Sequence, residues 1–190
     1  MFRTKNRRSY LIAGSLGMML AAAALFSVQA SADDRVLGPV APLIAAKQWL
    51  NTPRLTAEML RGKVVLVDFW TYSCGNCLNA LPSVKLWDEK YRAQGLVVIG
   101  VHTPEFPAER DRQSVEQAVK RLGVVYPVVL DNQYEIWNAY ANKYWPAQYL
   151  IDAQGQLRFQ HYGEGAYQEI ELNIQTLLKE ARPGSSVTLR

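Results

Sequence analysis

Residues 63–77 read KVVLVDFWTYSCGNC, and this stretch decides the fold. Its first part, Lys63–Trp70, is rich in β-branched and aromatic side chains and predicts a buried strand. Cys74 and Cys77 follow, and apolar residues at helical spacing continue from there to about Gln94. The stretch therefore predicts a strand that leads through a short loop into a helix, with two cysteines at the start of that helix.

The chain on either side continues the alternation of strands and helices. Strands are predicted at 96–101, 127–130, 147–151 and 156–162. Helices are predicted at about 103–122, 134–142 and 166–181. Residues 33–62 mix prolines with short apolar pieces, which we interpret as a lead-in with short strands. This order predicts an α/β fold with helices on both faces of the sheet.

Composition limits the class of protein. The chain has 190 residues, of which 49% are hydrophobic and 20% charged, which fits one compact domain. Residues 1–32 hold four of the 21 Lys and Arg residues and no acid, so the remaining 17 cations balance the 17 acids. This balance argues against nucleic acid as a partner. Two cysteines are too few for a disulfide-stapled scaffold, and we expect neither a metal site nor a cofactor.

The N-terminal residues are typical of an export signal. Arg3, Lys5, Arg7 and Arg8 precede an apolar stretch from Leu11 to Val28, and small-x-small cleavage sites follow. We predict a signal peptide over 1–32 and a mature domain over 33–190. The alternative is an uncleaved membrane anchor. The pair Arg7-Arg8 also resembles a twin-arginine signal, and by this or the general secretory route we expect a periplasmic protein.

The sequence Cys74-Gly75-Asn76-Cys77 is the candidate reactive centre. A helix N-terminus beside Cys74 would stabilise its thiolate and lower the pKa of its thiol, which makes Cys74 the predicted nucleophile. Cys77 lies one turn further in and is the predicted resolving thiol. Half of a zinc site and an inert structural disulfide are the alternatives. Zinc needs four ligands, and only His102 and His161 remain.

Two further residues carry functional predictions. Asp68 interrupts the apolar run six residues before Cys74. Burial would raise the pKa of its carboxyl group, which could then exchange a proton with Cys77. The alternative is that Asp68 lies at a sheet end in contact with water. The sequence Trp145-Pro146 precedes a strand, where proline removes a ladder hydrogen bond; a cis bond there would turn the chain.

These pieces together resemble the thioredoxin fold, and more closely the TlpA/DipZ-like branch of exported bacterial thioredoxin-like proteins. The resemblance spans roughly residues 49–180. Its motifs are Trp70-Thr71-Tyr72-Ser73-Cys74 with Asn76-Cys77, Val101-His102-Thr103-Pro104-Glu105-Phe106, Tyr144-Trp145-Pro146-Ala147 and Gly163-Glu164-Gly165. It implies a thioredoxin fold with a central mixed sheet and an N-terminal extension.

The resemblance also implies roles for individual residues. Cys74 would be the nucleophile, Cys77 the resolving thiol, Asp68 the buried acid–base group and Pro146 a cis-proline facing the disulfide. It implies a membrane electron donor of the DsbD/CcdA kind, which would be a separate protein because the chain carries no fused membrane domain of the DipZ type. Some relatives place a Glu three residues after the second cysteine, where this chain has Ala80; Glu105 is a possible auxiliary carboxylate.

The leading hypothesis is a periplasmic thiol–disulfide oxidoreductase acting as a reductase of protein disulfides. The neutral Asn76 favours the reductive direction, and the residues expected to contact a substrate peptide are Trp70, Tyr72, Trp145, Gly75 and Asn76. One alternative is a thiol peroxidase, because Thr71-x-x-Cys74 resembles a peroxiredoxin motif, although Val67 stands where that motif has proline. Another is a non-enzymatic copper chaperone that uses both thiolates.

Overall fold

The computed structural model describes residues 38–182, so the predicted signal peptide lies outside the described residues. These residues form a six-stranded sheet in the order β1-β4-β3-β2-β5-β6. The strands are β1 (Trp49–Leu50), β2 (Val64–Trp70), β3 (Leu96–His102), β4 (Val128–Leu130), β5 (Ala147–Ile151) and β6 (Leu157–Tyr162). Strands β2, β3 and β4 run parallel, whereas β1, β5 and β6 pair antiparallel with their neighbours. The predicted mixed sheet is confirmed.

Strand β2 lies inside the sheet between β3 and β5, and all seven of its residues are buried. Successive side chains of a strand point to opposite faces. Leu66 and Trp70 accordingly pack in the core that contains both cysteines, whereas Val65, Val67 and Phe69 pack in the core on the other face. Asp68 shares the alternation of Leu66 and Trp70 and so points to the cysteine face.

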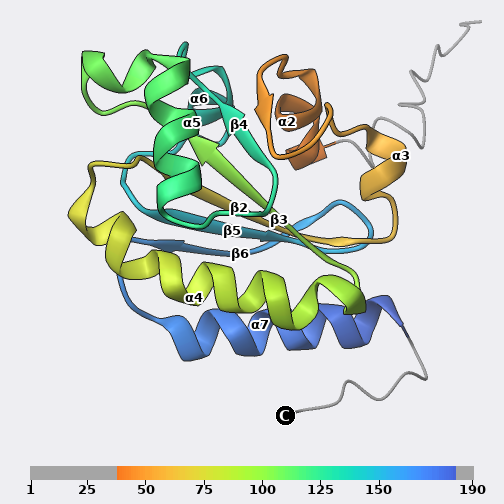
Figure 1. Ribbon diagram of the computed structural model, residues 1–190. Helices are drawn as coiled ribbons and strands as arrows, with labels where there is room; N and C mark the ends of the chain where they lie inside the picture. Colours follow the sequence, from red (N-terminus) through yellow and green to blue (C-terminus); the bar gives the residue numbers. More distant parts are fainter. Residues whose placement is uncertain (1–37, 183–190) are drawn as a thin grey trace, which may run out of the picture.

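Helices cover both faces of the sheet, as predicted (Figure 1). Helices α4 (Gly75–Tyr91), α5 (Arg112–Arg121) and α7 (Tyr167–Ala181) contribute to the core that contains the cysteines. Helices α2 (Ala41–Ala45), α3 (Ala57–Leu60) and α6 (Glu135–Ala139) contribute to the opposite core. Figure 1 shows α4 and α7 side by side along one face of the sheet. Three short 3₁₀ segments complete the chain: η1 (Gly38–Val40), η2 (Arg92–Gln94) and η3 (Pro107–Arg110).

The helix predicted from about residue 103 begins later than expected. Residues 107–110 form η3, and α5 begins only at Arg112. Asp111 caps α5, because its carboxylate accepts a hydrogen bond from the Ser114 backbone N–H at 2.8 Å. The residue before a proline is pushed towards extended backbone, and Phe106, which precedes Pro107, has φ −120° and ψ 153°. Pro107 therefore keeps Phe106 extended, and regular helix begins only after the short η3 segment.

The lead-in also differs from the prediction of short strands. Within its described part, only β1 is a strand, two residues long, while η1, α2 and α3 are helical. Thr56 explains one of these helices, because its hydroxyl accepts a hydrogen bond from the Met59 N–H and caps α3. Residues 38–182 contain no helix with the length and apolar character needed to cross a membrane.

Candidate active site

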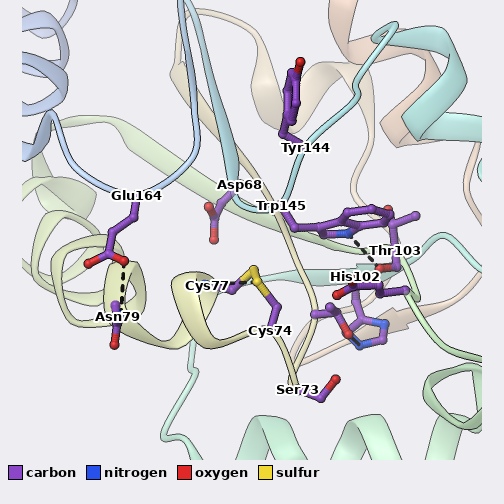
Figure 2. Close-up of a disulfide and its surroundings, with 12 residues drawn as sticks. Asp68, Ser73, Cys74, Cys77, Asn79, His102, Thr103, Tyr144, Trp145 and Glu164 are labelled. Atoms are coloured by element: carbon purple, nitrogen blue, oxygen red, sulfur yellow. Dashed lines mark hydrogen bonds between the residues drawn. A yellow bond between two sulfur atoms is a disulfide. The ribbon is translucent and has the colours of Figure 1, made fainter.

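The two cysteines lie at the start of α4 and are joined by a disulfide (Figure 2). Cys74 is the N-cap residue, with extended backbone at φ −74° and ψ 114°. Its Sγ accepts a hydrogen bond from the Cys77 N–H at 3.1 Å. Sulfur thus satisfies one of the free N–H groups of the first helical turn, a role that oxygen side chains usually fill.

The two cysteines of the disulfide differ in their exposure to solvent. Cys74 is 9% exposed and Cys77 is 3% exposed, while the intervening Gly75 and Asn76 are exposed. The helix N-terminus carries partial positive charge and favours a thiolate at Cys74. Cys74 is therefore the more accessible of the two cysteines, and the order of attack stays a prediction.

Asp68 is buried on the cysteine face of the sheet, with 3% of its surface exposed. Its Oδ1 accepts a hydrogen bond from Gln148 Nε2 at 2.8 Å. Burial raises the pKa of the Asp68 carboxyl group to about 7, against the smaller lowering effect of the Gln148 amide. In Figure 2, Asp68 lies on the Cys77 side of the disulfide. The alternative of a solvated carboxylate at a sheet end does not hold.

The Trp145–Pro146 peptide bond is cis. Trp145 is half-buried, and its indole Nε1–H donates to the Thr103 carbonyl oxygen at 3.0 Å. The Trp145 ring also lies against Trp137, with ring centroids 4.0 Å apart. These contacts hold the segment before β5 against the loop that follows β3.

Trp70 does not line a surface groove, and that part of the sequence prediction is wrong. Trp70 is 1% exposed, because it lies on the cysteine face of the central strand and packs in the core. Its indole nitrogen would lie 2.9 Å from a Cβ placed on Gly100 of the neighbouring strand, so the two residues fit only without a side chain there. Tyr72 and Trp145 are half-buried and accessible beside the disulfide.

A buried polar cluster beside Cys74 was missed from the sequence. It consists of Thr71, His102 and Glu109, with the exposed Ser73 at its edge. The Ser73 hydroxyl donates to Glu109 Oε1, and Thr71 Oγ1 lies 3.2 Å from His102 Nε2. Burial by itself would raise the pKa of Glu109, but hydrogen bonds from Ser73, Thr71 and the backbone N–H groups of Phe106 and Glu105 lower it overall.

The sequence carries a signal for Gln148, the hydrogen-bond partner of Asp68, but none for Glu109. Gln148 stands in a strand of otherwise apolar residues, as Asp68 does, and the antiparallel register pairs the two directly. Glu109 follows two prolines at the end of a loop, and nothing in the sequence distinguishes it from Glu105. In the structure Glu105 is exposed, and its backbone N–H donates to Glu109 Oε2 at 2.6 Å. The buried carboxylate near the cysteines, besides Asp68, is therefore Glu109.

The loop Gly163-Glu164-Gly165 borders the other end of the site. Asn79 of α4 donates from Nδ2 to Glu164 Oε2 at 3.1 Å (Figure 2). The residues described in the structure contain no group of three or more His, Cys, Asp or Glu side chains that could hold a metal ion.

The fold and the site together define a thioredoxin-like domain of the thiol–disulfide oxidoreductase type. Its marks are a Cys-x-x-Cys disulfide at the start of a helix, a buried aspartate on the preceding central strand and a cis-proline before the next antiparallel strand. The chain belongs to the AhpC/TSA family, whose model matches residues 37–160.

Individual relatives agree with this class. The chain is 50% identical to the protein DipZ of Mycobacterium tuberculosis over 139 residues, which are 72% of this chain and 20% of DipZ. It therefore spans about a fifth of that relative's length. It is 30% identical to the thiol-disulfide oxidoreductase YkuV of Bacillus subtilis over 142 residues, which are 75% of this chain and 95% of YkuV. The solved thioredoxin-like protein SPOA0173 matches with a TM-score of 0.66 and 27% identity, covering 73% of this chain and 95% of that one.

Proposed function

We propose that this chain is an exported thiol–disulfide oxidoreductase that reduces disulfides in other proteins. Cys74 is the nucleophile, Cys77 the resolving thiol, and Asp68 the proton-exchanging group. The observation that carries the proposal is the Cys74–Cys77 disulfide at the start of α4, together with a buried aspartate on the same face of the sheet whose pKa is raised to about 7. A sequence of two thiol–disulfide exchanges follows from this arrangement.

In the first exchange, the reduced Cys74 thiolate attacks one sulfur of the substrate disulfide. A Cys74–substrate bond forms, the substrate's S–S bond breaks, and the released substrate sulfur takes a proton from water. The backbone N–H of Cys77, which lies 3.1 Å from Cys74 Sγ, stabilises the charge on that sulfur before attack.

In the second exchange, Cys77 attacks Cys74 Sγ. The Cys77 thiol is buried and must lose its proton to become reactive, and Asp68 lies on the same face of the sheet. A carboxyl group with a pKa of about 7 is present in both forms near neutrality. Asp68 takes the Cys77 proton and passes it to the departing substrate sulfur, so that the substrate leaves with both its sulfurs as thiols and the disulfide seen here is formed.

The surface around Cys74 suits an extended polypeptide. Tyr72 and Trp145 offer partly exposed rings on one side, and Gly75 and Asn76 leave the approach to the sulfur open. Pro146, with its cis bond, lies in the segment before β5. A peptide substrate would bind here through backbone hydrogen bonds, with the aromatic rings contacting its side chains.

The site of action and the electron donor form part of the same proposal. Residues 1–32 have the layout of an export signal, which supports a periplasmic domain of residues 33–190. Each turnover leaves the disulfide form, so a dithiol must reduce Cys74–Cys77 again. A membrane protein of the DsbD/CcdA kind would supply these electrons from the cytoplasmic side.

Trapping experiments test the proposal. The reduced Cys77→Ala variant should form a stable mixed disulfide with a disulfide-containing protein such as insulin, because the second exchange is removed. The Cys74→Ser variant should form no mixed disulfide and should lose reductase activity. Each of the two variants thus serves as the control for the other. Full activity in Cys74→Ser would refute the assigned nucleophile. Steady peroxide consumption, or stoichiometric Cu(I) binding without dithiol exchange, would instead support the peroxidase or the copper chaperone.

The reduction potential decides the direction of electron flow. Equilibration of the mature protein with defined thiol–disulfide buffers should give a value near about −270 mV, as for thioredoxin. A value above about −180 mV would contradict the reductive assignment and indicate a disulfide donor or isomerase.

A further inference from the structure

Glu109 is a buried carboxylate that accepts a hydrogen bond from Ser73, the residue immediately before Cys74. Glu109 is 2% exposed and lies in η3, in the loop between β3 and α5. The Ser73 hydroxyl donates to its Oε1. The backbone N–H groups of Glu105 and Phe106 donate to its Oε2 at 2.6 and 3.0 Å. A carboxylate that accepts this many hydrogen bonds is held in its ionised form.

The side chains around Glu109 do not cancel its charge. His102 is fully buried, and burial lowers its pKa to about 4, so it is neutral near pH 7. One orientation satisfies this part of the cluster: His102 Nε2–H donates to Thr71 Oγ1, and the Thr71 hydroxyl donates to Glu109. Tyr72, stacked on His102, has its pKa raised by partial burial and by the charges of Glu109 and Asp111, against the smaller lowering effect of Arg121. The cluster thus keeps one negative charge.

This charge opposes the effect of the helix N-terminus. The start of α4 favours a thiolate at Cys74, whereas an anion held through Ser73 disfavours it. In Figure 2, Ser73 and His102 lie on the Cys74 side of the disulfide and Asp68 on the Cys77 side. The Glu109 carboxylate is therefore linked through Ser73 to the residue before Cys74, whereas Asp68 lies on the side of Cys77.

We propose that Glu109 is a positioning residue that holds a fixed negative charge beside Cys74, makes its thiolate less stable and thereby makes the dithiol a stronger reductant. A destabilised thiolate means a less stable reduced form, which lowers the reduction potential. Glu109 also anchors the loop that carries Phe106, since the backbone N–H groups of Glu105 and Phe106 donate to its Oε2. The inference rests on the proposed function and assigns Glu109 as a residue that favours the reductive direction of electron flow.

The test compares Glu109→Gln with Ser73→Ala. Glu109→Gln removes the charge and keeps the shape, so the pH at which Cys74 is half ionised should fall by about one unit. The equilibrium constant with glutathione should shift about tenfold towards the reduced protein, which corresponds to about 30 mV. Ser73→Ala removes one donor and leaves the anion, so the Cys74 ionisation should stay unchanged or move to higher pH.

The measurements are the thiolate ultraviolet absorbance of the reduced proteins against pH and their redox equilibria, with circular dichroism to confirm folding. An unchanged Cys74 ionisation in folded Glu109→Gln would overturn the inference. A fall in Ser73→Ala would overturn it as well, even if Glu109→Gln failed to fold, because contact with the loop rather than charge would then set the thiolate. Failure of the proposed function itself is distinguishable, since the wild-type protein would then not exchange with substrate disulfides.

Discussion

Gln148 Nε2 donates a hydrogen bond to Asp68 Oδ1 at 2.8 Å, and the two residues face each other across the antiparallel pair β2–β5. Both side chains are buried, with exposures of 2% and 3%. The amide therefore holds the carboxyl group in place on the cysteine face of the sheet and favours its ionised form, while burial favours the neutral form. The balance between the two leaves Asp68 able to accept and return a proton near neutrality.

Replacing Gln148 should change the pH dependence of the second exchange. In Gln148→Leu the bond that lowers the pKa of Asp68 is lost, so this pKa should rise above about 7, by about one unit. The midpoint of the pH profile for the rate at which Cys77 resolves a mixed disulfide should then lie about one pH unit higher than in the wild type. Single-turnover kinetics across pH measure this rate. Gln160→Leu, on the exposed face of β6, is the control and should keep the wild-type profile.

Asp68 should also make the protein less stable as pH rises. The folded protein holds a proton on Asp68 up to about pH 7, whereas the unfolded chain releases it near 3.8. At Asp68 the folded state therefore binds more protons between these values, so the contribution of this residue to the free energy of unfolding falls through this window by something on the order of 4 kcal/mol. Asp68→Asn should match the wild type below pH 4 and exceed its stability above pH 7. Denaturant unfolding of the oxidised proteins tests this, and an identical pH slope in both would contradict it.

His102 should have the opposite effect on the acid side. Burial lowers its pKa to about 4 from 6.5, so the unfolded chain binds a proton in this window that the folded protein does not. The contribution of His102 to stability is therefore complete above about pH 6.5 and is lost as pH decreases towards 4, by an amount on the order of 3 kcal/mol, which offsets much of the Asp68 effect in the same window. His102→Phe keeps the stacked ring and should remove this acid limb. His161→Phe replaces the second histidine of the chain, which lies on β6, and should keep the loss of stability at acid pH in the same unfolding experiment.

Gly100 should tolerate no side chain. A Cβ there would lie 2.9 Å from Trp70 Nε1 and 3.1 Å from a Tyr126 ring carbon, and both of these rings are buried. Gly100→Ala should therefore lower the free energy of unfolding by about 1–3 kcal/mol through overpacking. At Gly75 a Cβ would meet no atom within 4 Å, so Gly75→Ala is the matched control. Equal stabilities of the two variants would show that the Trp70 ring moves aside freely.

Much of the fold was predictable from local patterns. The strand at 64–70, the helix that follows the cysteines and the hairpin of β5 and β6 all lie within a few residues of the predicted positions. These elements have strong periodicity and clear ends, such as Gly95, whose left-handed backbone at φ 104° ends η2. The predicted helix over 103–122 begins too early, because Phe106 before Pro107 is extended and the short η3 segment precedes the Asp111 cap of α5.

The site was predictable only where reactive residues are close in sequence. Cys74 and Cys77 identify themselves by spacing, and Asp68 by its place in an apolar strand. The contacts of Gln148 and Glu109 span 80 and 36 residues and depend on strand register and on the path of a loop. The burial of Trp70 likewise depends on which face of β2 meets α4. None of these relationships leaves a periodic pattern in one chain.

The hydrogen bond from the Cys77 N–H to Cys74 Sγ ties a backbone amide to the sulfur that changes bonding partner in each cycle. The strength of that bond depends on whether the sulfur is a thiolate, a thiol or part of a disulfide. The Cys77 amide resonance in a ¹⁵N-labelled sample should therefore move with redox state and, in the reduced protein, with pH. One backbone signal would follow the charge on Cys74 during turnover without any label on the reacting side chain.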